Sequence, residues 1–216
     1  MPPPDTHSLR EETAGRVWLA LSIGALVAWT ALVHAHPPRF FVLASAFCAV
    51  WLGLSWKALG PRRRELPRMT GADLAWSVAH AGGLYVGARA FLWAFCGGFT
   101  EALCGPLTAV YARFGEGGLG EAVALAAVIA PAEEFLWRGV VQGALRPRLG
   151  RVGCVVVASV LSSAVLLAFG EPLLALAALP TSLAWGGLAE WRRSLGAAWA
   201  SHALWDVLIV VLAPAA

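Results

Sequence analysis

The chain has 216 residues, of which 59% are hydrophobic and only 13% are charged. Soluble domains carry about half apolar and about a quarter charged residues, so this composition excludes an ordinary soluble fold and predicts an integral membrane protein. The formal net charge of +3 comes from short basic loops without an extended basic stripe, and we therefore expect no nucleic acid partner.

The chain opens with a polar segment, 1–16, followed by an apolar run from Val17 to Val33. No convincing cleavage site follows the run, so we interpret it as a retained helix rather than a signal peptide. Further along the chain, apolar segments recur that approach the roughly 20 residues needed to cross a bilayer. The predicted spans are 17–35, 40–57, 72–95, 119–145, 152–169, 172–189 and 195–214.

We therefore expect an all-α polytopic bundle of about seven transmembrane helices, since backbone polar groups in lipid must be satisfied within helices. Segment 97–114 is interpreted as interfacial or re-entrant, which leaves an eighth span open. We divide the chain into a polar N-terminus (1–16), a first group of helices with the outer segment (17–118), and a second group that carries the polar motifs (119–214).

The loop charges predict the orientation of this bundle. With seven spans, the loops on one face hold twelve Lys and Arg residues, whereas those on the other face hold only Arg39 and Arg113. By the positive-inside rule the N-terminus is cytoplasmic. We expect a multi-pass protein of a bacterial-type inner membrane, in contact with the lipid bilayer.

Ionisable side chains in a spanning helix cost about 2.5–3.5 kcal/mol each and mark candidate functional sites. In "PAEEFLWRG", Glu134 and Arg138 are four residues apart and are expected to form a buried ion pair. Glu133 lies about 100° around the helix and is expected to face a cavity. The alternative is a purely structural cluster of all three, but two acids and one base leave one carboxylate unmatched.

Two other helices carry ionisable groups. In the last span, His202 and Asp206 are four residues apart and share a face. His80 lies among small residues in 72–95, where a packing role and a catalytic role both remain open.

A carboxylate, an imidazole and a second carboxyl suffice for metal-free hydrolysis of a peptide bond. The carboxylate can deprotonate a water, and the imidazole can stabilise an oxyanion. We expect no cofactor. Zinc is the weaker alternative, because Glu, His and Asp all bind it but no H-E-x-x-H motif is present.

"EEFLWR" fits E-E-x-x-x-R, and "HALWD" fits H-x-x-x-[ND]. In this order the two motifs resemble the CAAX-protease and bacteriocin-processing family, which includes the type II CAAX prenyl endopeptidases. The likeness covers about residues 119–214. It implies that Glu133 activates the hydrolytic water, that Glu134 and Arg138 support it, and that His202 and Asp206 hold the oxyanion.

The chain departs from the family between these motifs, where F-x-x-x-H is usual. Leu166 and Gly170 fall at those positions in one alignment, and Phe169 and Leu173 in another. Neither alignment supplies the histidine. Glu171 and His80 are its candidate replacements.

The resemblance implies a glutamic-type intramembrane endopeptidase. Its expected substrate is a membrane-anchored or C-terminally processed peptide or protein, cut near its membrane-embedded or lipid-linked C-terminal region. Two alternatives remain. One is a weakened or inactive relative that acts as a membrane peptide-binding or immunity protein, and the other is a transporter with a buried proton-linked site.

Overall fold

The computed structural model describes residues 22–35, 40–60, 68–96, 105, 118–170 and 172–212. Within these ranges every regular element is a helix and no strand occurs, which confirms the predicted all-α class. The predictions for 1–16, and for 97–114 apart from Gly105, lie outside the described residues.

The predicted spans correspond closely to observed helices. The first described helix is Ser22–Ala35. It is followed by α2 (Phe40–Ala58) and α3 (Gly71–Cys96). Near the C-terminus, α8 (Pro172–Arg192) precedes α9 (Leu195–Asp206), which continues into the π-helical η5 (Val207–Leu212).

The predicted spans 119–145 and 152–169 form one run of helical segments with a single sharp reversal. The first part comprises α5 (Leu119–Ala124), η2 (Leu125–Ile129), α6 (Ala130–Glu134) and η3 (Phe135–Gln142). The second comprises α7 (Gly143–Ala164) and η4 (Val165–Phe169). The chain reverses inside α7 at Gly150, where φ is 67° and ψ is −172°, so the turn expected near 146–151 is present.

This is an integral membrane protein. Among the described residues, three helical stretches are long and apolar enough to cross a bilayer: Phe40–Ala58, Leu119–Phe169 and Leu195–Leu212. The reversal at Gly150 divides the middle stretch in two. Ser22–Ala35 is a shorter apolar helix. The total of about seven spans stays a prediction.

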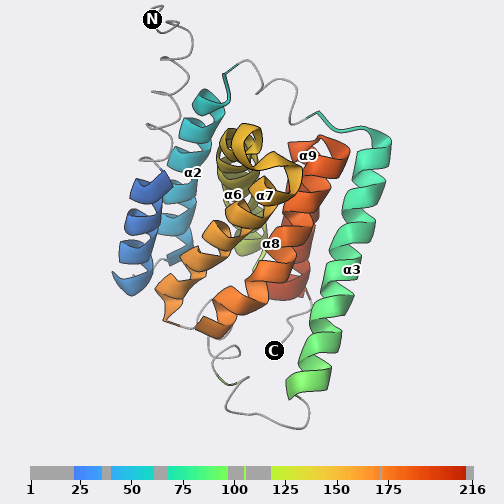
Figure 1. Cartoon of the computed structure of the whole chain (residues 1–216). Coiled ribbons are helices and arrows are strands. Elements are labelled where there is room, and N and C mark those ends of the chain that lie inside the picture. Colours follow the sequence, from blue (N-terminus) through green and yellow to red (C-terminus); the bar gives the residue numbers. More distant parts are fainter. Residues whose placement is uncertain are drawn as a thin grey trace, which may run out of the picture.

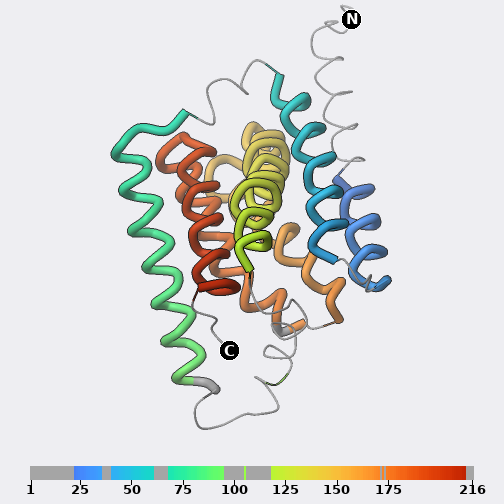
Figure 2. The backbone as a smooth tube through the Cα atoms, turned by 180° about the vertical axis from the view of Figure 1, so that it is seen from behind, coloured from blue at the N-terminus to red at the C-terminus, as the bar shows by residue number. Residues whose placement is uncertain are grey.

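Figure 1 shows α2 and the first helix on one side of the bundle, α3 on the opposite side, and α6 to α9 between them. The view from behind shows the same order (Figure 2). α2 packs its small residues Ala44 and Cys48 against Leu125, Ile129 and Ala132. Small side chains let helices approach closely in lipid, where van der Waals packing replaces the hydrophobic effect between helices.

Several polar contacts hold α9 in place. Ser194 caps its N-terminus by accepting from the Ala197 amide at 3.1 Å. Ser77 on α3 donates to the Ala197 carbonyl at 2.9 Å, and the Trp199 indole donates to the Ala126 carbonyl at 2.9 Å. Together these bonds set the rotation of α9, and with it the direction in which His202 points.

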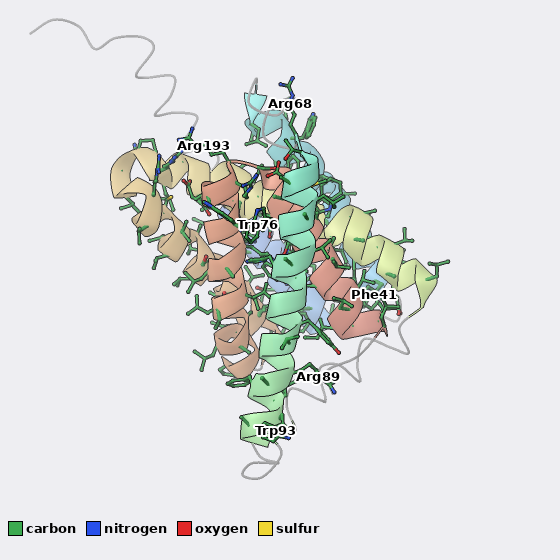
Figure 3. All side chains as sticks on the ribbon, turned by 90° about the vertical axis from the view of Figure 1, so that its right-hand side faces the viewer. Phe41, Arg68, Trp76, Arg89, Trp93 and Arg193 are labelled. Atoms are coloured by element: carbon green, nitrogen blue, oxygen red, sulfur yellow. The ribbon has the colours of Figure 1, made fainter. Side chains whose placement is uncertain are left out.

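One end of the bundle is basic. Figure 3 shows Arg68 and Arg193 at one end and Arg89 with Trp93 at the other. Arg192 pairs with Asp73 at the start of α3, with Nε 2.8 Å from Oδ1. We call the end that carries Arg68, Arg192 and Arg193 the basic end.

The reversal at Gly150 generates a prediction for stability. A side chain is strained at positive φ with extended ψ, so Gly150→Ala is expected to destabilise the protein by about 1–3 kcal/mol. Gly187→Ala is the matched control, because an added Cβ on α8 meets nothing within 4 Å. Thermal unfolding in detergent measures both, and equal melting temperatures would contradict this account of the turn.

Candidate active site

Glu134 lies at the centre of the site and is completely buried. Its Oε1 is 3.4 Å from Arg138 Nη1, which confirms the predicted ion pair. The same oxygen is 2.8 Å from Nδ1 of His202 on α9. Glu134 therefore joins the two motifs, whereas the sequence analysis predicted only its pair with Arg138.

Arg138 is anchored on its other side by α8. Its Nη2 donates to the carbonyl and the hydroxyl of Ser182, at 2.8 Å and 2.9 Å. The Ser182 hydroxyl is in turn hydrogen-bonded to the hydroxyl of Ser162 on α7. The buried guanidinium thus has an acid and two oxygen acceptors, as a buried cation requires.

His202 is held by a stacked ring and by its Nδ1 bond. The Trp185 indole lies parallel to the imidazole, with centroids 3.8 Å apart and an interplanar angle of 18°. The Nε2 atom is left facing two acids, with Asp206 Oδ1 at 3.6 Å and Glu133 Oε2 at 3.8 Å. These distances exceed a hydrogen bond but lie within ion-pair range.

Glu133 differs from its neighbour Glu134 in exposure. The side chain of Glu133 is 42% exposed, against 0% for Glu134. It lines a cavity of about 570 Å³ together with Arg138, His202 and Asp206. The expectation that Glu133 faces a cavity is confirmed. The volume lies within the range of small-molecule and peptide side-chain sites.

The rest of the cavity wall is mostly apolar. It includes Gly83, Gly87 and Phe91 of α3, Ala177 of α8 and Ile209 of η5. The cavity therefore combines a long apolar wall with one cluster of charged groups. This combination suits a ligand that carries one polar bond on an apolar segment.

Of the two candidate replacements for the missing histidine, the structure describes His80 but not Glu171. Glu171 lies outside the described residues. His80 is not among the residues that line the cavity, and its Nδ1 is 2.8 Å from the Ser201 hydroxyl on α9. Leu166 lines the cavity, and Gly170 ends η4 in the left-handed conformation with φ 77°.

In the described part of the chain, no three His, Cys, Asp or Glu side chains are grouped so as to hold a metal ion. Within the site, His202 Nδ1 is already bonded to Glu134.

Sequence reasoning missed Ser182 and Trp185, which anchor Arg138 and His202 from α8. The segment 172–189 reads as an ordinary apolar span. The polar "PTS" within it was the one available signal, since Pro180, Thr181 and Ser182 interrupt the run of Ala and Leu.

Comparison with known families finds a similarity in the second half of the chain. Residues 116–208 match a family model described as type II CAAX prenyl endopeptidase Rce1-like. The matched segment contains both motifs and every charged residue that meets at the cavity. No curated protein and no solved structure matches the chain.

The burial of Glu134 generates a prediction that separates the two glutamates. Glu134→Gln removes the anion between Arg138 and His202, and loss of one partner from a buried pair costs about 3–5 kcal/mol. Glu133→Gln leaves that pair intact, so its effect on stability is expected to stay below about 1 kcal/mol. Unfolding of both purified variants in detergent measures the difference. Equal losses of stability would contradict the separate roles.

Proposed function

We propose that this chain is a member of the CAAX-protease and bacteriocin-processing family, which the match over residues 116–208 supports, and that it hydrolyses peptide bonds with a water that Glu133 activates. The substrate is a membrane-anchored or C-terminally processed peptide or protein. The bond that is cut lies near the membrane-embedded or lipid-linked C-terminal region of that substrate.

One observation carries the proposal. Glu133 and the Nε2 atom of His202 come from two helices, lie 3.8 Å apart and face the same cavity. A water bound to Glu133 and a carbonyl oxygen bound to Nε2 would therefore be neighbours. That is the arrangement that addition of water to a carbonyl requires.

The reaction then has two proton transfers. Glu133 takes a proton from the water as its oxygen bonds to the carbonyl carbon. When the carbon–nitrogen bond breaks, Glu133 returns that proton to the leaving amine. One carboxyl group thus serves first as base and then as acid, and no other proton donor is needed.

His202 and Glu134 act on the carbonyl side. In its protonated form His202 donates from Nδ1 to Glu134 and from Nε2 into the cavity, where it can hold the oxyanion. The Trp185 stack and the Glu134 bond fix the ring, so it needs no reorientation during the reaction. Asp206, 3.6 Å from Nε2, balances the charge on the imidazole.

The cavity wall supports the choice of substrate. A soluble peptide would gain little from a wall of Gly, Ala, Leu and Phe side chains, whereas an apolar membrane segment would fill it. An inactive relative that only binds such segments is the competing proposal, supported by the absent histidine.

The first prediction of this proposal concerns Glu133. Glu133→Gln is expected to lower cleavage at least about 1,000-fold, because general acid and base catalysis are both lost. Glu121→Gln is the matched control and should cleave normally, because the Glu121 carboxylate only accepts from the Gly118 amide at the start of α5. The substrate is found by comparing membrane-protein C-termini in cells that carry either variant. Normal processing by Glu133→Gln would refute the mechanism.

A strong chelator tests the metal-free chemistry of the same reaction. Full cleavage by purified protein after prolonged chelation is expected, because the carboxylate alone activates the water. Loss of cleavage that added zinc restores would instead establish the zinc alternative.

The third prediction concerns His80. If His80 only positions α9, then His80→Ala and Ser201→Ala should lower kcat to similar extents, and the double variant should be no worse than either. If His80 replaces the missing histidine in the chemistry, Ser201→Ala will be nearly normal while His80→Ala is inactive. Glu171→Ala, assayed beside them, tests the other candidate.

A further inference from the structure

A line of polar groups leaves the candidate active site in the direction away from the cavity. Arg138, Gln142 and Arg146 follow one another at intervals of four residues and so lie on one helix face. Opposite them stand Ser182 and Glu190 of α8, with Ser159 of α7 beside them. We call these six residues the polar file.

The contacts of the polar file connect the site with the basic end. Gln142 Nε2 lies 3.3 Å from the Gly186 carbonyl and 3.4 Å from Glu190 Oε1. Glu190 pairs in turn with Arg146, at 3.2 Å, and the Arg146 side chain is 38% exposed. At the inner end, Arg138 and Ser182 line the cavity.

Between Arg138 at its inner end and Arg146 at its outer end, the polar file contains two polar atoms without hydrogen-bond partners. Gln142 Oε1 and Ser159 Oγ are buried and have no hydrogen-bond partner in the part of the chain that the structure describes. The two residues are only 3% and 1% exposed. A buried carbonyl and a buried hydroxyl without a partner are costly, so such groups typically bind an internal water.

Glycine 186 lets the two unpartnered oxygens approach the α8 backbone, because it has no side chain. A Cβ at this position would stand 3.0 Å from Val155 Cγ1, 3.2 Å from Gln142 Oε1 and 3.4 Å from Ser159 Oγ. Both oxygens therefore flank one point beside the glycine. A water held between these two oxygens would have two protein partners, the minimum for an ordered buried water.

Most of the cavity wall offers water no polar partner, and its uncharged polar side chains include Ser162, Ser163, Thr181 and Ser182. Its wall is mostly apolar, and Gln142, Ser159 and Glu190 do not contribute to it. An apolar substrate segment in the cavity would displace water from that side. Each hydrolysis nevertheless consumes one water, which must then reach Glu133 from elsewhere.

We propose that Gln142 and Ser159 form a hydration site, and that the polar file supplies water from the basic end to the catalytic cavity. Water passes from Arg146 and Glu190 to the Gln142–Ser159 site. From there it passes by Ser182 and Ser162 into the cavity at Glu133. The proposal that the polar file supplies water for hydrolysis rests on the proposed peptidase function, whereas the hydration site itself does not.

Thiol exchange tests the hydration site without any activity. Ser159→Cys is made in a full-length chain whose four natural cysteines are replaced by alanine, and S–H to S–D exchange in D2O is followed by infrared spectroscopy. A chain that keeps only Cys48, which is buried in the apolar cluster with Ala44, is the control. The introduced thiol is expected to exchange at least about ten times faster than Cys48. Equal slow rates would overturn the proposal.

Gln142→Leu then tests the supply of water. It keeps the approximate size of the side chain but removes both polar atoms, and should slow the exchange of the introduced thiol about tenfold. With substrate it should lower kcat and leave KM unchanged, while Gln142→Asn should restore part of the rate. Val156→Leu, on the exposed face of α7, is the control for a substitution to leucine away from the polar file.

The outcomes separate this proposal from the peptidase proposal. Fast exchange in a chain without cleavage activity would refute the peptidase and leave the hydration site established. Full cleavage by Gln142→Leu together with unchanged exchange would refute the polar file and leave the peptidase intact.

Discussion

The carboxylate of Glu134 is the interaction on which the site depends. It is wholly enclosed and bonds to an arginine on its own helix and a histidine on α9. In a dry environment such bonds are strong, and an unpaired member is costly, so each group fixes the others. This buried anion orients His202 and Arg138, together with the Trp185 stack, the Ser182 bonds and the polar contacts that hold α9.

The site separates polar from apolar surroundings within a few ångströms. Glu133 is the next residue along the helix, yet a turn of about 100° carries it from the sealed interior to the cavity wall. The apolar wall extends from there along α3 and η5, while the polar file extends toward the basic end. Under the proposed function, substrate and water would thus approach Glu133 from different directions.

Much of this arrangement could be predicted from local spacing. The pairs Glu134–Arg138 and His202–Asp206 are four residues apart, and a helix brings such residues together whatever the fold. The outward direction of Glu133 follows from the same geometry. The bond between Glu134 and His202, 68 residues apart, could not be predicted in this way, because it requires the packing of α9 against α6. Trp185 and Ser182 were missed for the same reason.

The sequence by itself determined that lipid surrounds the chain, that the fold is helical and which residues can carry charge, because composition and periodicity act within each segment. It also determined the resemblance of the second half of the chain to a peptidase family, since both motifs are local. Only the tertiary structure decided that Glu134 is completely enclosed and that its carboxylate bonds to His202 on another helix. It also decided that His80 bonds to Ser201 rather than lining the cavity. Burial is a property of neighbouring helices, and no single helix contains that information.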